Sequence, residues 1–152
     1  MSAEAIEVSE SPTVADFTVR RATTTRWSDN DMYGHLNNAV YYQLFDAAIN
    51  GWIIEQTGVD PVTAPTLGVV VESGCRYFEQ LHFPQALQVG IRVARLGRTS
   101  VTYDLALFAA ELPETSPVAA RGRWVHVYVD RDTRRPEPIP ADLRQLFESA
   151  IG

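Results

Sequence analysis

Residues 26–46 read RWSDNDMYGHLNNAVYYQLFD, and this stretch decides how the chain folds. Its first half is dense in turn-forming residues around Gly34. Its second half opens a longer run, residues 39–55, that contains no proline and no glycine until Gly51. The apolar residues of that run have helical spacing but cover more than one face. We therefore predict a tight turn followed by a long helix that other parts of the chain wrap.

The residues around this helix are typical of strands. Asn37 or Asn38 can cap the helix start, and Gly58 marks its exit. A short amphipathic helix is predicted over residues 140–151. The segments rich in β-branched and aromatic residues, which predict strands, are Phe17–Trp27, Leu67–Phe78, Leu87–Arg95, Thr99–Ala110 and Val118–Val129. The break LGR is short enough to predict an antiparallel hairpin. The simplest arrangement is an α+β fold, a five-stranded antiparallel sheet wrapped around one long helix.

Length and composition limit the class of protein. The chain has 152 residues, the size of one domain, and a formal charge of −6. Residues 1–16 are small, polar and acidic, so we expect a disordered tail before a domain over residues 17–152. No run of basic residues provides a nucleic-acid face. The N-terminus has no long apolar run, so we expect a cytoplasmic protein that does not enter a membrane. Cys75 is the only cysteine, which excludes an intramolecular disulfide.

The turn and the helix start together hold groups suited to acyl-transfer chemistry. A carboxylate in the turn before a helix can face a carbonyl group docked at the first turn of that helix. The free backbone amides there point outward, and the helix dipole favours negative charge. Asp31 lies six or seven residues before those amides. One contiguous segment can therefore supply both a base and an oxyanion hole.

This segment resembles the entry motif of the 4-hydroxybenzoyl-CoA-thioesterase-like family, whose members commonly read R-W-x-D-x-D-x-x-G-H-x-N-N-x-x-Y. Weaker agreement runs through VVVESGCRYFEQL, RLGRTSVTYDLALF and PIPADL. The resemblance implies a hotdog fold and an acyl-CoA thioesterase that hydrolyses an acyl or aryl thioester to the free acid and CoA, with no cofactor. The matching positions are Arg26, Trp27, Asp29, Asp31, Gly34, His35, Asn37, Asn38 and Tyr41.

The resemblance also implies roles for single residues. Asp31 matches the catalytic aspartate, acting as general base or nucleophile, and the amide of Asn38 matches the oxyanion donor. His35 is a third catalytic candidate, but plant acyl-carrier-protein thioesterases carry an asparagine where this sequence has Tyr33, so a role in holding the turn stays open. Asp29 is expected to accept turn amides. The candidates for substrate binding are Tyr33, Gly34 and Tyr41, together with Arg98 for the nucleotide phosphates of CoA.

Other functions fit the motif less well. An EF-hand loop fails because Val40 stands where the chelating glutamate is required. A metal site built from Asp29, Asp31 and His35 has no further ligands at a telling spacing, so we expect none. A hydratase or dehydratase would need a longer spacing between Asp31 and His35. A non-catalytic acyl-CoA-binding protein is the alternative from another class.

The predicted sheet leaves an open edge, and open edges invite pairing. By resemblance, two subunits join edge to edge, so we expect a homodimer or a homotetramer. Glu72 follows three valines in a strand that we expect to be buried, where it would pair with Arg76 or with a neighbouring subunit. The sequence leaves open the length of the acyl chain and whether the thiol is CoA or acyl carrier protein.

Overall fold

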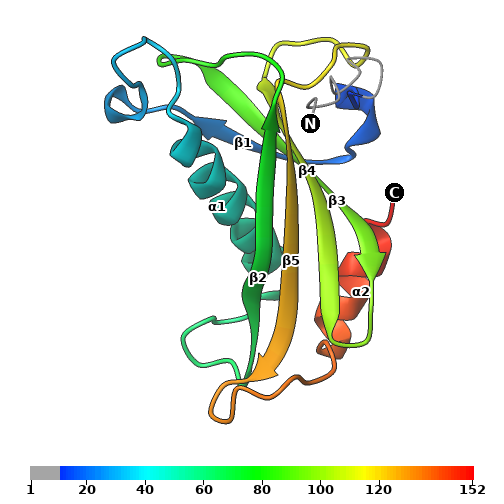
Figure 1. Cartoon of the computed structure of the whole chain (residues 1–152). Coiled ribbons are helices and arrows are strands. Elements are labelled where there is room, and N and C mark those ends of the chain that lie inside the picture. The colour runs from blue at the N-terminus through cyan, green and yellow to red at the C-terminus, as the bar shows by residue number, and fades with distance from the viewer. Residues whose placement is uncertain (1–10) are drawn as a thin grey trace, which may run out of the picture.

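A five-stranded antiparallel sheet packs against one long helix in the computed structural model, which describes residues 11–152 (Figure 1). The strand order is β1-β3-β4-β5-β2, so β1 and β2 form the two edges. This is the predicted hotdog architecture. The elements are β1 (Val19–Thr24), α1 (Asn38–Thr57), β2 (Thr66–Tyr77), β3 (Ala86–Leu96), β4 (Ser100–Ala109), β5 (Ala120–Asp130) and α2 (Ala141–Ser149).

Helix α1 has the ends that its sequence predicts. The side chain of Asn37 accepts a hydrogen bond from the amide of Ala39 at 3.0 Å, which makes Asn37 the N-cap. Gly58 ends the helix with a φ of 70°, and its amide bonds to the carbonyl of Ile54 at 2.8 Å. Glycine adopts this left-handed conformation without a steric penalty.

The core lies between α1 and the inner face of the sheet. Phe45 of α1 is fully buried, and its ring centroid lies 5.8 Å from that of Trp124 on β5. A Cβ added to Gly122 would come within 2.8 Å of the Phe45 ring, so the glycine lets the helix approach the sheet. Helix α2 closes the far end of the core, with Phe147 packed against Trp52 and Tyr103.

A second, smaller core covers part of the opposite face. Residues 14–16 form a short 3-10 helix, and Val14 and Phe17 are buried against Phe108 of β4 and Val118. Hydrogen bonds from the amides of Val14 and Ala15 to the segment 114–116 hold it in place. The described part of the predicted tail, residues 11–16, is thus packed on the sheet, while residues 1–10 lie outside the described part.

Strand β2 is an exposed edge, which differs from the buried strand that its valines suggest. Val70 and Val71 are 48% and 58% exposed, and the pairing with β5 shifts between Val70 and Glu72. The Glu72 carboxylate meets Nε of Arg123 on β5 at 3.0 Å. The expected pairing of Glu72 with Arg76 is therefore wrong, because the partner comes from the neighbouring strand.

Candidate active site

The turn that carries Asp31 is closed by its own backbone. The Asp31 amide donates to the carbonyl of His35 at 2.9 Å, and the Gly34 amide donates to the carbonyl of Asp31 at 3.1 Å. Gly34 has a φ of 80°, a conformation that favours glycine. One carboxylate oxygen of Asp31, Oδ1, accepts the Tyr33 amide at 2.9 Å. The other, Oδ2, has no hydrogen-bond donor among residues 11–152 and is available to a substrate or a water molecule.

Neighbouring residues anchor this turn to the protein. Asp29 is buried, and its carboxylate accepts hydrogen bonds from the amide and the guanidinium group of Arg26. Burial raises the pKa of Asp29, but the hydrogen bonds and charge of Arg26 outweigh it and lower that pKa overall. The Leu36 amide bonds to the carbonyl of Leu81 at 2.7 Å, beyond the end of β2. Asp29 has the structural role that the sequence predicts.

The first turn of α1 leaves one amide open. The side chain of Asn37 accepts the Ala39 amide, and the carbonyl of Asn37 accepts the Val40 amide at 2.9 Å. The amide of Asn38 has no acceptor in the described part of the chain. A helix start with an unsatisfied N–H attracts a negatively charged oxygen.

Most of the predicted site residues line one cleft of about 590 Å³. One wall comes from the motif and the first turn of α1, and the other from the end of β2 and the residues after it. The lining residues are Asp31, Tyr33, His35, Leu36, Asn38 and Tyr41 on the first wall, and Tyr77, Phe78, Glu79 and Gln80 on the second. The sequence did not predict the second wall. Its residues follow the motif by about forty positions, and no local pattern links two segments so far apart.

Two tyrosines join the walls of the cleft. The rings of Tyr41 and Tyr77 meet edge to face, with centroids 4.8 Å apart. The hydroxyl of Tyr77 donates to the carbonyl of Asn38 at 3.1 Å and so holds the start of α1 against β2. Burial raises the pKa of both tyrosines, so both are neutral at pH 7.

Comparison with known proteins decides the family. The model of the thioesterase-like superfamily matches residues 25–147, which is most of the chain and includes the whole motif. The chain belongs to the thioesterase-like superfamily. Its hotdog fold and this membership make it a thioester hydrolase.

Solved structures agree with this membership. The PA5185 protein of Pseudomonas aeruginosa is 43% identical over 93% of this chain and 97% of its own, with a TM-score of 0.88. PA2801, a proposed thioesterase of the same organism, is 29% identical over 84% of this chain and 95% of its own, with a TM-score of 0.77. A predicted thioesterase of Bacillus stearothermophilus is 28% identical over 88% and 96%, with a TM-score of 0.74. No curated protein sequence matches the chain.

Two predicted substrate-binding residues do not line the cleft of the thioesterase. Gly34 shapes the turn beside it but is not among the lining residues. Arg98 is exposed in the turn between β3 and β4, which Figure 1 places at the other end of the sheet from the start of α1. The fold of one chain therefore does not bring Arg98 to Asp31.

Two further reactive groups, one buried and one half-buried, do not line the cleft of Asp31. His126 on β5 is buried with Nδ1 3.3 Å from the Tyr103 hydroxyl, and burial lowers its pKa to about 4. Burial raises the pKa of the Cys75 thiol to about 11, so this thiol is a weak nucleophile at neutral pH.

Among residues 11–152, no helix is long and apolar enough to cross a bilayer.

Proposed function

We propose that the protein hydrolyses an acyl or aryl CoA thioester, with Asp31 as general base and the Asn38 amide as oxyanion donor. One observation carries this proposal. A carboxylate with an open oxygen and a helix start with an open amide line the same cleft, and the motif around them belongs to thioesterases. A base and an oxyanion donor are what acyl transfer to water requires.

The proposed reaction runs in two steps. Asp31 takes a proton from a water molecule whose oxygen attacks the thioester carbonyl, and the resulting oxyanion accepts a hydrogen bond from the Asn38 amide. The tetrahedral intermediate then collapses, the carbon–sulfur bond breaks, and the departing thiolate takes the proton from Asp31. The products are a carboxylic acid and a thiol, and the carboxylate of Asp31 is restored. His35 lines the same cleft, and we propose it as a hydrogen-bond donor to the substrate.

Direct attack by Asp31 is the competing mechanism, and isotope labelling separates the two. In a single turnover with excess enzyme in ¹⁸O-water, a general base puts ¹⁸O into the acid product. A nucleophilic aspartate would form a mixed anhydride, and water attacking at the Asp31 carbonyl would leave ¹⁸O in the enzyme. Detection of labelled Asp31 by mass spectrometry would overturn the general-base assignment.

We further propose that the site is completed in a homodimer, which could itself pair into a tetramer. Three observations support an interface along β2. Within residues 11–152 its outer edge is unpaired, and it carries exposed Val70 and Val71. Met32 and Tyr33 project from the motif turn, both almost fully exposed. Exposed apolar side chains at an open sheet edge indicate a protein partner. Light scattering that gave a monomer under assay conditions would contradict this proposal.

Release of free thiol from a panel of acyl-CoA and aryl-CoA thioesters tests the function. We expect turnover with at least one member, and the dependence of kcat/KM on chain length and aromaticity identifies the acyl group. Acyl-carrier-protein thioesters form a parallel set. Binding of CoA thioesters without thiol release would contradict the enzymatic function and favour a binding protein.

A further inference from the structure

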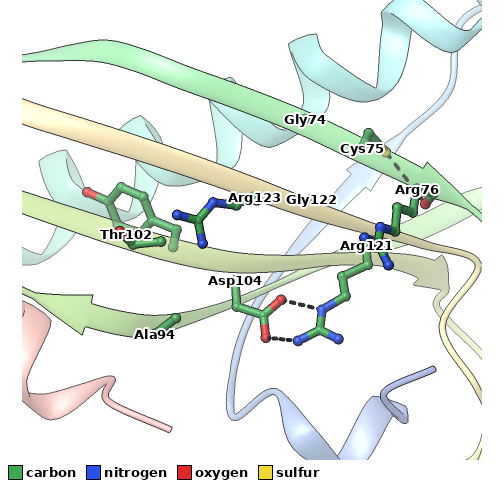
Figure 2. Close-up of a pocket in the computed structure, with 10 residues that line it drawn as sticks. Gly74, Cys75, Arg76, Ala94, Thr102, Asp104, Arg121, Gly122 and Arg123 are labelled. Carbon is green, nitrogen blue, oxygen red and sulfur yellow. Dashed lines mark hydrogen bonds and ion pairs between the residues drawn. The ribbon is translucent and has the colours of Figure 1, made fainter. Parts of the chain in front are cut away.

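Tyr77 is the last residue of the edge strand β2, and its side chain lies on the α1 side of the sheet. Its neighbour Arg76 lines a cavity of about 510 Å³ on the opposite face, which Figure 2 shows with α1 behind the sheet. Successive side chains of a strand alternate between the two faces, so Tyr77 turns toward α1. There its ring meets that of Tyr41 edge to face, and it lines the cleft of Asp31. The proposed reaction gives this side chain no role.

The two peptide groups of Asn38 show what the Tyr77 hydroxyl holds. In the group before Asn38, the carbonyl of Asn37 accepts the Val40 amide at 2.9 Å, and the N–H of Asn38 is the proposed oxyanion donor. In the group after it, the Ala39 N–H donates to the Asn37 side chain at 3.0 Å. The carbonyl of that group belongs to Asn38 and accepts the Tyr77 hydroxyl at 3.1 Å. Three of the four polar groups are therefore held, and the fourth is open to the substrate.

The bond from Tyr77 differs from the others in its origin. The bonds to Asn37 lie within the cap and first turn of α1, whereas Tyr77 stands on β2, 39 residues after Asn38. A movement of the helix start that turned the Asn38 N–H away from the cleft would also draw the Asn38 carbonyl away from Tyr77. The bond thus fixes the direction of the oxyanion donor relative to the second wall of the cleft. Burial raises the pKa of the Tyr77 hydroxyl, so this group stays protonated and able to donate at neutral pH.

Strand β2 is also the edge that we propose as the dimer interface. Among residues 11–152 it pairs with β5 alone, so its outer side makes no backbone ladder. Pairing with a second copy adds backbone hydrogen bonds along this side and restrains the end of the strand. Through the Tyr77 hydroxyl, that restraint reaches the start of α1.

We infer that Tyr77 is a positioning residue, which aligns the oxyanion donor of Asn38 and ties this alignment to the paired edge of β2. This inference rests on the proposed function and adds to it a residue that acts through Asn38. It also gives the homodimer a role in catalysis beyond shaping the cleft, because the partner's hold on β2 is transmitted to the oxyanion hole.

Steady-state thiol release by Tyr77→Phe tests the positioning role. Phenylalanine keeps the ring and its contact with Tyr41 but removes the donor. We expect kcat to fall about fivefold, the equivalent of about 1 kcal/mol, since one hydrogen bond contributes about this much. KM should stay within about twofold, because an oxyanion donor binds the transition state more tightly than the ground state. Tyr128→Phe, which removes the hydroxyl of a buried tyrosine at the other end of β5, is the matched control and should lower the melting temperature without changing kcat.

A double-variant cycle with Asn37→Ala separates positioning from general damage to the cleft. Asn37 and Tyr77 hold the same helix start, so once one bond is lost the other has less left to align. The double variant should therefore lose less activity than the product of the two single losses. Losses that multiply would show that the two residues act independently, and would overturn the inference. An unchanged kcat in Tyr77→Phe would overturn it as well.

Infrared spectroscopy of a bound thioester separates this inference from the proposed function. The probe is the acyl-CoA that releases thiol fastest, or benzoyl-CoA if none does, with ¹³C at the carbonyl and bound to Asp31→Asn. A hydrogen bond from the Asn38 amide lowers the stretching frequency of this carbonyl, and adding Tyr77→Phe should move the band back toward that of the free thioester. A band that moves, without thiol release from any thioester, would remove the proposed function and keep the positioning role. Turnover with a band indifferent to Tyr77→Phe would do the reverse.

Amide hydrogen exchange tests the link to the edge strand. Val70 and Val71 are exposed on β2, so Val70→Arg/Val71→Arg places two charges in the proposed interface. In this variant, as in Tyr77→Phe, we expect the Val40 amide in the first turn of α1 to exchange about fivefold faster. Val62→Arg, which changes an exposed valine in the loop after α1, is the control and should leave the exchange rate unchanged. An unchanged exchange rate in a monomeric Val70→Arg/Val71→Arg variant, or a variant that stays dimeric by light scattering, would overturn the link.

Discussion

Replacing Asn37 with alanine should remove the N-cap of α1 and lower both the stability of the protein and its turnover rate. The side-chain oxygen of Asn37 accepts the Ala39 amide at 3.0 Å, and alanine removes that acceptor. Loss of an N-cap of this kind costs about 1 kcal/mol. For a domain of this size the melting temperature should fall by about 3 °C.

The effect on turnover follows from the next residue along the helix. The Asn38 amide is the proposed oxyanion donor, and it is aimed by a helical turn that the cap holds. With the cap lost, this turn frays, and we expect kcat to fall about tenfold, part of the loss that follows removal of an oxyanion-hole donor. KM should change little, because the amide binds the transition state more tightly than the ground state.

Thermal melts and thiol-release kinetics on the same preparations measure the two effects. Asn37→Ser restores a capping oxygen and should recover both properties. Asn50→Ala, which removes a side chain bonded to the Asp46 carbonyl on the exposed side of α1, controls for loss of an asparagine from this helix. A variant that loses about 1 kcal/mol of stability but keeps its full kcat would refute the role of the helix start in catalysis.

Two further predictions concern the core. Gly122→Ala should destabilise the protein by about 1–3 kcal/mol in urea melts, because the new methyl group meets the Phe45 ring at 2.8 Å, whereas Gly74→Ala, which meets no atom, should be close to neutral. His126 has a folded pKa of about 4 against an ordinary 6.5, so the unfolded chain takes up the proton first as the pH falls. Its contribution to stability is complete above pH 6.5 and declines by about 3 kcal/mol by pH 4, and His126→Gln should remove this part of the pH dependence. Equal urea midpoints for the two glycine variants, or an unchanged pH dependence in His126→Gln, would contradict the assigned packing.

The sequence predicts the fold because its local signals agree with one another. The helix over residues 39–55 lacks breakers and carries apolar side chains on several faces, and in the structure α1 spans Asn38–Thr57 between the cap and Gly58. The LGR break forms the predicted hairpin between β3 and β4. In both places spacing and turn chemistry act within a few residues, where sequence reasoning is strongest.

The features that the sequence did not predict depend mainly on where a strand lies in the sheet. A run such as Val69–Val71 reads as buried, yet β2 is an edge strand, and strand order is not visible in the strand itself. The same holds for Glu72, whose partner Arg123 stands on another strand. Tyr77 lies in the cleft because the end of β2 packs against the start of α1, a contact between distant parts of the chain. Val14 and Phe17 are a further case. They lie in or next to a polar, acidic segment for which the sequence predicts disorder, yet their two apolar side chains are buried in the smaller core on the sheet.

The most direct test of the account is the turnover of Asp31→Asn. Asparagine keeps the oxygen that accepts the Tyr33 amide, so the turn should fold as before, while the capacity to take a proton is lost. Asp46→Asn changes an exposed carboxylate of α1 outside the cleft and is the matched control. The account predicts that kcat for the best acyl-CoA falls by roughly 10²–10⁴-fold in Asp31→Asn, with an unchanged melting temperature and normal activity in Asp46→Asn. Loss of a general base should lower kcat by at least about a hundredfold. A kcat for Asp31→Asn that stays within about threefold of the kcat of the unmodified enzyme would contradict the account.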